Sequence, residues 1–265
     1  MTKWRKHTRV WLVVIILILI AIAAIIWFSK STSAPGNEIV KQTVQHEPLK
    51  PVEPTFDKTQ FSLTDPTSLW VIVNKQHPLS PKDYLPASLV IPNIPLKSNI
   101  TSNEEYVSAA MAPALEQMVT AAKTQAINLN MQSGYRSYSY QVSLYGRYAN
   151  TYGASAADTF SAQPGYSEHQ TGLAVDLGGT SNPVCNVDQC YASTPEGQWL
   201  AANAYLYGFI IRYPDGGDAI TGYEYEPWHI RYVGVELSTE MHKQGITTLE
   251  QFFGVFGGPD YSTTP

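Results

Sequence analysis

A run of 19 consecutive apolar residues, Val10 to Phe28, constrains this chain more than any other part of its sequence. As a helix that rises 1.5 Å per residue, the run would span about 28 Å, close to the hydrocarbon thickness of a bilayer. Residues 1–30 contain five basic residues and no acidic one. Because the basic residues before the run keep the N-terminus in the cytoplasm, the sequence predicts a single-pass membrane anchor with everything after residue 30 outside the membrane.

A cleaved signal peptide is the alternative to an anchor. The apolar region of a signal peptide usually has about 7–15 residues, and this one is longer. Ala34 offers a cleavage residue, but Pro35 directly after it is unfavourable. No cysteine lies near the end of the run, so a lipid-modified anchor is excluded. We therefore favour an uncleaved, single-pass anchor in the cell membrane, with an extracytoplasmic domain.

The rest of the chain divides into a linker, a domain and a tail. Residues 31–60 contain four prolines and no apolar periodicity, which predicts an extended linker. We expect one folded domain at residues 61–258 and a short C-terminal tail at residues 259–265. The chain after residue 30 carries 12 basic and 22 acidic residues, a balance of −10. Such an acidic domain argues against nucleic-acid binding, which needs cations to replace phosphate counterions.

Helices and short strands alternate irregularly along the predicted domain, which favours the α+β fold class over a doubly wound sheet. Apolar spacing predicts strands at 69–73, 131–134, 172–177, 208–212 and 228–233. It predicts helices at 103–127, 138–151, 195–207, 235–243 and 248–254. Ser102-x-x-Glu105 and Thr247-x-x-Glu250 are expected to cap the first and the last of these helices.

Two histidines lie in unusual sequence contexts. One is in the run Ser167-Glu168-His169-Gln170-Thr171-Gly172-Leu173-Ala174-Val175-Asp176, and the other ends the run Glu226-Pro227-Trp228-His229. A catalytic zinc site needs three protein ligands and an open fourth position, and two histidines with one carboxylate meet that count. A further carboxylate that is not a ligand can act as a base. Each run alone is a weak signal, because a single histidine is more often a core or surface residue.

Together the two runs resemble the VanY-type D-alanyl-D-alanine carboxypeptidases, zinc peptidases of peptidoglycan stem peptides that also include L,D-carboxypeptidases. The resemblance extends over about residues 68–256. It includes Val73-Asn74-Lys75, Ser133-Gly134-Tyr135-Arg136-Ser137 with Gln141, Gly208-Phe209 with Arg212-Tyr213-Pro214, and Thr221 to His229. It implies a single zinc-peptidase domain with a small antiparallel sheet and flanking helices.

The resemblance also implies roles for individual residues. His169, Asp176 and His229 would be the ligands of a Zn²⁺ ion. Glu226 would be the general base, and Arg136 would polarise the scissile carbonyl and stabilise the oxyanion. Ser167 and Gln141 would line the substrate pocket. For Arg136 a structural ion pair is the alternative, and for Ser167 and Gln141 the alternative is a local cap.

The chain has two cysteines, Cys185 and Cys190. Outside the membrane, a local disulfide between them is the natural interpretation, and a pair of metal ligands is the alternative.

These observations favour a membrane-anchored zinc D,D-carboxypeptidase that removes the terminal D-Ala from peptidoglycan stem peptides. One alternative is an L,D-carboxypeptidase with the same metal site and a tetrapeptide substrate. An alternative of another class is a non-catalytic wall-binding module on the same fold. The presence of Glu226 argues against that module, because a binding protein has no need for a base beside the metal. Crowding by Tyr223, Tyr225 and Trp228 suggests a narrow site, which favours the D-Ala-D-Ala end.

Overall fold

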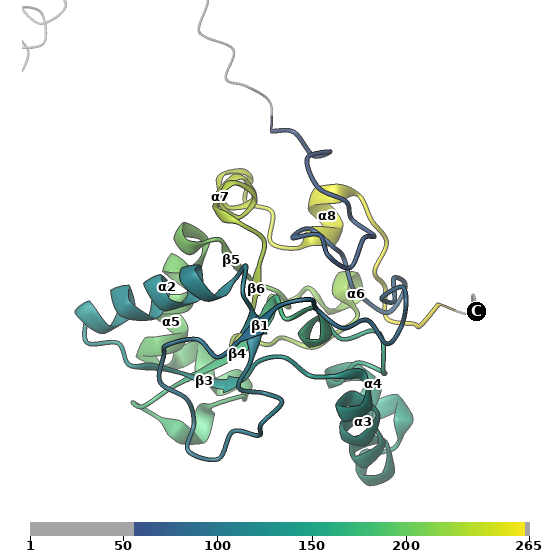
Figure 1. Ribbon diagram of the computed structural model, residues 1–265, viewed down its shortest axis with the longest axis horizontal. Coiled ribbons are helices and arrows are strands. Elements are labelled where there is room, and N and C mark those ends of the chain that lie inside the picture. Colours follow the sequence, from purple (N-terminus) through teal and green to yellow (C-terminus); the bar gives the residue numbers. More distant parts are fainter. Residues whose placement is uncertain (1–55, 263–265) are drawn as a thin grey trace, which may run out of the picture. The chain divides into compact units, whose positions relative to one another are not determined.

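The computed structural model describes residues 56–262, and a four-stranded antiparallel sheet lies at the centre of that part of the chain (Figure 1). Its strands are β3 (Leu129–Ser133), β4 (Ala174–Gly179), β5 (Phe209–Ile211) and β6 (His229–Tyr232), in the spatial order β3-β4-β6-β5. A separate two-stranded sheet pairs β1 (Leu89–Val90) with β2 (Val107–Ser108). The fold is therefore α+β with small antiparallel sheets, as predicted.

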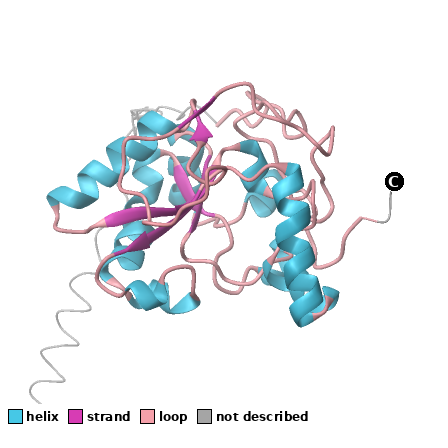
Figure 2. Ribbon diagram, turned by 60° about the horizontal axis from the view of Figure 1, so that its bottom comes forward, coloured by secondary structure: helices cyan, strands magenta, loops and turns pink. Residues whose placement is uncertain are grey.

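Helices gather on both sides of the central strands (Figure 2). The α-helices are α2 (Ala112–Thr124), α3 (Tyr138–Tyr152), α4 (Ala154–Phe160), α5 (Pro195–Asn203), α6 (Asp218–Thr221), α7 (Val235–Gln244) and α8 (Leu249–Phe253). Short 3-10 turns occur at η1 (Glu168–Thr171), η2 (Pro183–Cys185), η3 (Gln189–Ser193) and η4 (Ala204–Tyr207).

Apolar and polar side chains alternate along β4 and β6, so the sheet has one face towards the core and one polar face. Val175 and Leu177 on β4 and Ile230 on β6 are fully buried in a cluster with apolar residues of α2 and α5. Since successive side chains of a strand point to opposite faces, Asp176 and His229 project away from that cluster. The core packing of the sheet thus fixes the orientation of both polar side chains.

Most of the predicted elements are confirmed to within a few residues, but the helix predicted at 103–127 begins only at Ala112. The backbone before it is paired with other segments: Gly134 N–H donates to Glu104 C=O at 2.7 Å, and Tyr135 N–H donates to Tyr106 C=O at 2.7 Å. A helix there would need these carbonyls for itself. The predicted capping box at Ser102 is therefore wrong, and Thr101 Oγ1 instead donates to Glu104 Oε2 at 2.8 Å.

The predicted strand at 69–73 is buried but is not a strand. Arg231 takes the place of a neighbouring strand, because its Nη2 donates to the carbonyls of Leu69 at 3.0 Å and Val71 at 2.8 Å. The second capping prediction is displaced by one residue: Thr248, not Thr247, accepts the N–H of Gln251 at 3.2 Å and caps α8.

Both ends of the described segment pack against the domain. Phe56 stacks on Trp70 with ring centroids 5.5 Å apart and meets Phe252 edge-on at the same distance. At the other end, Pro259 C=O accepts from Lys75 Nζ at 2.8 Å, and Tyr261 OH accepts from Gln163 N–H at 2.9 Å.

Cys185 and Cys190 form a disulfide with a Cα–Cα distance of 5.3 Å, as expected. The bond closes a short loop between β4 and α5. The predicted anchor at 10–28 and nearly all of the predicted linker lie outside the described residues. Within residues 56–262, no helix has both the length and the apolar character needed to cross a membrane.

Candidate metal centre

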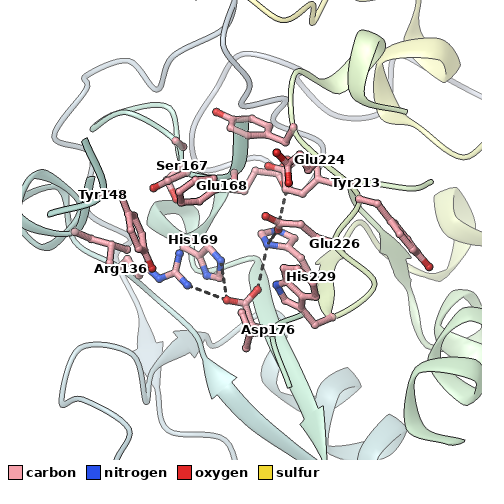
Figure 3. Close-up of a pocket in the computed structure, with 18 of the residues that line it drawn as sticks. Arg136, Tyr148, Ser167, Glu168, His169, Asp176, Tyr213, Glu224, Glu226 and His229 are labelled. Carbon is pink, nitrogen blue, oxygen red and sulfur yellow. Dashed lines mark hydrogen bonds and ion pairs between the residues drawn. The ribbon is translucent and has the colours of Figure 1, made fainter. Parts of the chain in front are cut away.

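The site begins with a cross-strand pair. Asp176 on β4 and His229 on β6 are directly opposite each other in the antiparallel register. Asp176 Oδ1 lies 3.2 Å from His229 Nδ1, and both side chains are almost fully buried. Neighbouring strands therefore hold a carboxylate and an imidazole within reach of one ion (Figure 3).

His169 is the third member of the group and comes from the 3-10 turn η1. Its Nδ1 contacts Gly134 C=O at 2.7 Å, and because a carbonyl only accepts, Nδ1 must carry the proton. The lone pair of Nε2 is then free, and Nε2 lies 3.4 Å from Asp176 Oδ2. Gly134 is required at this point, since a Cβ there would lie 2.3 Å from Tyr106 C=O.

His169, Asp176 and His229 fit a zinc ion. One ligand atom from each residue can be chosen such that all three lie within 4.8 Å of one another. Zinc binds nitrogen and oxygen ligands at about 2.0–2.2 Å, in a tetrahedral arrangement. Asp176 Oδ1 is buried and finds no hydrogen-bond partner within the described segment, as is expected of an atom that ligates an ion.

The protonation states of two members suit ligation directly. Burial and the nearby Arg136 charge lower the pKa of His169, which keeps its imidazole neutral. Burial alone would raise the pKa of Asp176, but His169, His229 and Arg136 hold it well below its usual range. At neutral pH the group therefore offers an ionised carboxylate and one neutral imidazole.

His229 differs. Burial would lower its pKa, but contacts with Asp176 and Glu168 and the nearby Glu226 raise it to about 9. Its imidazole is therefore protonated at neutral pH while no cation is bound. Since a ligand nitrogen must be deprotonated, metal binding has to displace this proton.

Glu226 lies at the edge of the group and has a carboxyl oxygen, Oε2, 3.4 Å from His229 Nδ1. Burial, with a smaller contribution from the Asp176 charge, raises the pKa of Glu226 to about 8, although His229 and Arg136 oppose the shift. A carboxyl with such a pKa can take up and release a proton near neutral pH.

Arg136 contacts a prospective ligand directly. Its Nη2 donates to Asp176 Oδ2 at 2.8 Å and to Ser133 Oγ at 2.8 Å, and its Nε lies 3.4 Å from Glu104 Oε1. The guanidinium thus forms the ion pairs that were the alternative interpretation of this residue. It also lines the cavity over the metal group, so it lies within reach of a substrate bound there.

A cavity of about 550 Å³ opens over the group, and all seven residues predicted for catalysis, substrate binding or metal ligation line it. Ser167 and Gln141 are both buried in its wall. Gln141 Nε2 donates to Ala162 C=O at 2.7 Å, which leaves Gln141 Oε1 without a partner in the described structure. Gln141 is therefore better suited to accept a substrate N–H than to donate to a carboxylate.

Sequence reasoning missed several contributors to the site. Ser133 Oγ hydrogen-bonds Asp176 Oδ2, and Glu104 pairs with Arg136. Glu168 lies between Ser167 and His169 in the first histidine motif, and the sequence indicates no role for it, although its Oε2 is 3.9 Å from His229 Nε2. Position within the motif was a signal for Glu168, whereas nothing in the sequence around Glu104 indicates its partner.

Comparisons with known proteins place this arrangement in a family. The sequence profile of the family described as VanY, D-alanyl-D-alanine carboxypeptidase, matches residues 104–235. A D-alanyl-D-alanine carboxypeptidase of Enterococcus faecalis is 31% identical over 223 residues, which cover 80% of this chain and 73% of that protein. The chain belongs to the VanY family. A further relative, the putative carboxypeptidase YodJ of Bacillus subtilis, is 40% identical over 225 residues, which cover 85% of this chain and 80% of YodJ.

Solved structures similar to this VanY-family chain include enzymes of two specificities. The LD-carboxypeptidase LdcB is 40% identical with a TM-score of 0.67, and the match covers 72% of this chain and 88% of that one. A D,D-pentapeptidase VanY from a VanB-type resistance cassette, in complex with Zn(II), is 31% identical with a TM-score of 0.56. That match covers 69% of this chain and 97% of the VanY chain.

Proposed function

We propose that this chain is a zinc carboxypeptidase that hydrolyses the C-terminal D-Ala from peptidoglycan stem peptides. The observation that carries the proposal is the position of Glu226, a protonatable carboxyl 3.4 Å from His229 in the same cavity as the metal group. A wall-binding module would not need this carboxyl. Membership of the VanY family and the relatives named D-alanyl-D-alanine carboxypeptidase support the hydrolytic activity.

Zinc is the metal that the donor set favours. Two imidazole nitrogens and one carboxylate with an open fourth position are typical of catalytic zinc sites, and the VanY structure in complex with Zn(II) supports the same choice. When bound to His169, Asp176 and His229, zinc would supply a Lewis acid and lower the pKa of a water molecule.

The chain's own residues would then perform the proton transfers and hold the substrate. Glu226 takes the proton of the attacking water on its carboxylate and later gives it to the leaving D-Ala amine. Arg136 places its guanidinium beside the negative charge that develops on the carbonyl oxygen. Ser167 donates its hydroxyl to the terminal carboxylate, and Gln141 accepts an N–H of the peptide.

The D,D cut, between two D-Ala residues, is the specificity that the sequence favours. The family description and the E. faecalis relative support this cut. Tyr223, Tyr225 and Trp228 line the cavity, as the prediction of a narrow site requires. Tyr223 is buried in the domain, however, and the volume of the cavity is about 550 Å³, within the usual range for ligand sites. The three aromatic side chains therefore do not fill the cavity.

The L,D cut is a second candidate because two observations favour it. The similar LdcB structure is an LD-carboxypeptidase. In addition, the exposed carboxylates of Glu224 and Asp188 line the cavity. An L-Lys or diaminopimelate residue before the cut carries an ammonium group that such carboxylates can bind.

Localisation of this activity to the outer side of a bacterial membrane rests on the apolar run from Val10 to Phe28. An extracytoplasmic position would place the domain beside its proposed substrate. Protease treatment of intact cells without a wall should remove the domain if it lies outside the membrane and should leave it intact if it lies in the cytoplasm.

Mass spectrometry of defined stem peptides distinguishes the two cuts. A D,D enzyme converts pentapeptide to tetrapeptide at least several-fold faster than tetrapeptide to tripeptide, and an L,D enzyme shows the reverse order. Failure to release D-Ala from either peptide, with zinc bound, would contradict the proposed function.

A further inference from the structure

Glu168 is buried behind the metal group and interacts with two arginines. Its Oε1 accepts from Arg212 Nε at 2.8 Å and from Arg231 Nη1 at 2.7 Å, and all three side chains are completely buried. Arg212 also forms a two-pronged pair with Glu250, with Nη1 2.9 Å from Oε2 and Nη2 2.7 Å from Oε1. Two arginines and two glutamates thus balance in charge within the core.

The second carboxyl oxygen of Glu168 is not used by this network. Oε2 is buried and has no hydrogen-bond partner in the described part of the chain. The same holds for His229 Nε2, and these two atoms lie 3.9 Å apart (Figure 3). An acceptor and a ring nitrogen that both lack a partner therefore face each other across a short gap.

The opposite nitrogen of His229 faces the metal group. Nδ1 lies 3.2 Å from Asp176 Oδ1 and 3.4 Å from Glu226 Oε2. A histidine that ligates a metal with one ring nitrogen commonly donates the other N–H to a carboxylate, which fixes the tautomer and the ring orientation. The two sides of the His229 ring have the partners that this arrangement needs.

We propose that Glu168 is a positioning residue that accepts the Nε2–H of His229 and thereby presents Nδ1 to the metal. The inference rests on the proposed zinc site and adds to it a residue that acts through the ligand His229. Arg212 and Arg231 hold the carboxylate in place, because guanidinium groups only donate and Glu168 Oε1 is their shared acceptor.

Glu168→Gln tests this role with almost no change in shape. The amide oxygen of the new side chain has to accept from the two arginines, so its NH₂ group is turned towards His229 Nε2. Two donors cannot pair, and the ring is driven to the tautomer with hydrogen on Nδ1, which cannot ligate. We expect zinc affinity to fall about 10- to 100-fold.

Glu250→Gln is the matched control. Glu250 belongs to the same buried network, and this variant removes the same charge, but Glu250 contacts Arg212 and Asn74 instead of a metal ligand. Both variants should lower the melting temperature. Only Glu168→Gln should weaken zinc binding, measured by titrating zinc against a chromophoric chelator.

Equal zinc affinities for the two variants would overturn the positioning role and leave the zinc site intact. If the wild-type chain binds no zinc, the proposed function fails and this inference fails with it. Should Glu168→Gln not fold, long-range ¹H–¹⁵N spectra of the zinc-loaded wild-type protein decide. Hydrogen on Nε2 and metal on Nδ1 of His229 support the role, and metal on Nε2 refutes it.

Discussion

Asp176 and His229 are opposite each other in the register of two antiparallel strands, with Oδ1 and Nδ1 3.2 Å apart. The apolar neighbours of these residues face the core, so the same alternation that buries Val175 and Ile230 turns Asp176 and His229 towards the cavity. The ligand pair is therefore built by the fold itself. His169, which comes from a turn, depends instead on the contact of its Nδ1 with Gly134.

Substitutions should separate the ligands from the base. His169→Ala and His229→Ala remove a nitrogen that holds zinc, so the purified variants should contain little metal. Glu226→Gln should keep zinc and lose about 100- to 10,000-fold in turnover, because a positioned general base typically contributes that much. Metal analysis and kinetics of the three variants check this prediction, and a zinc-free Glu226→Gln would make Glu226 a ligand.

Zinc affinity should rise with pH. The pKa of His229 is raised to about 9, so below that value zinc has to displace a proton from its ring. Affinity should therefore increase about tenfold per pH unit between pH 7 and 9 and level off above. Chelator competition at several pH values measures the slope, and calorimetry in two buffers counts the released proton. A flat profile from pH 7 to 9 would show that His229 binds no proton there.

Gly134→Ala should damage the metal site although it adds a single methyl group. The new Cβ would lie 2.3 Å from Tyr106 C=O, so the loop that accepts His169 Nδ1–H has to move. We expect zinc affinity to fall about tenfold, in line with the loss of a partner to a ligating histidine. Gly146→Ala is the control, because its Cβ would meet nothing within 4 Å. Equal affinity in both variants would contradict the role given to Gly134.

Residues 56–60 should contribute to the stability of the domain. Phe56 packs against Trp70 and Phe252, and Lys58 Nζ donates to the carbonyl of Phe252. The free energy of unfolding should be about 1–2 kcal/mol lower for a chain that starts at residue 61 than for one that starts at residue 56, because the partly buried side chain of Phe56 no longer packs against the core. Denaturant unfolding of the two chains measures the difference, and coincident curves would place the domain boundary at residue 61 after all.

The sequence was informative where local patterns decide the structure. Apolar patterns located the strands that carry Asp176 and His229, and the family resemblance located seven of the residues that line the cavity. Where long-range contacts decide the structure, the prediction from sequence was wrong. The segment at 69–73 has the composition of a strand, but the guanidinium of Arg231, 160 residues further along, takes its carbonyls.

The same limit applies to residues around the site. Residues 104–106 have the spacing of a helix start, yet their carbonyls accept from Gly134 and Tyr135 and they cannot be helical. These hydrogen bonds hold Glu104 beside the segment that carries Arg136, and the two side chains form an ion pair. No local pattern encodes which distant backbone a carbonyl will meet, so such partners are visible only in the folded chain.

The release of free D-Ala by the domain, measured before and after metal removal, is the sharpest test of the proposed zinc carboxypeptidase activity. Residues 56–265 are incubated with pentapeptide and tetrapeptide stems, and the products are identified by mass spectrometry. We expect D-Ala release from at least one stem, loss of that activity after chelation, and recovery when about one equivalent of zinc is returned. Full activity in the chelated protein, or zinc-loaded protein that leaves both stems intact, would contradict it.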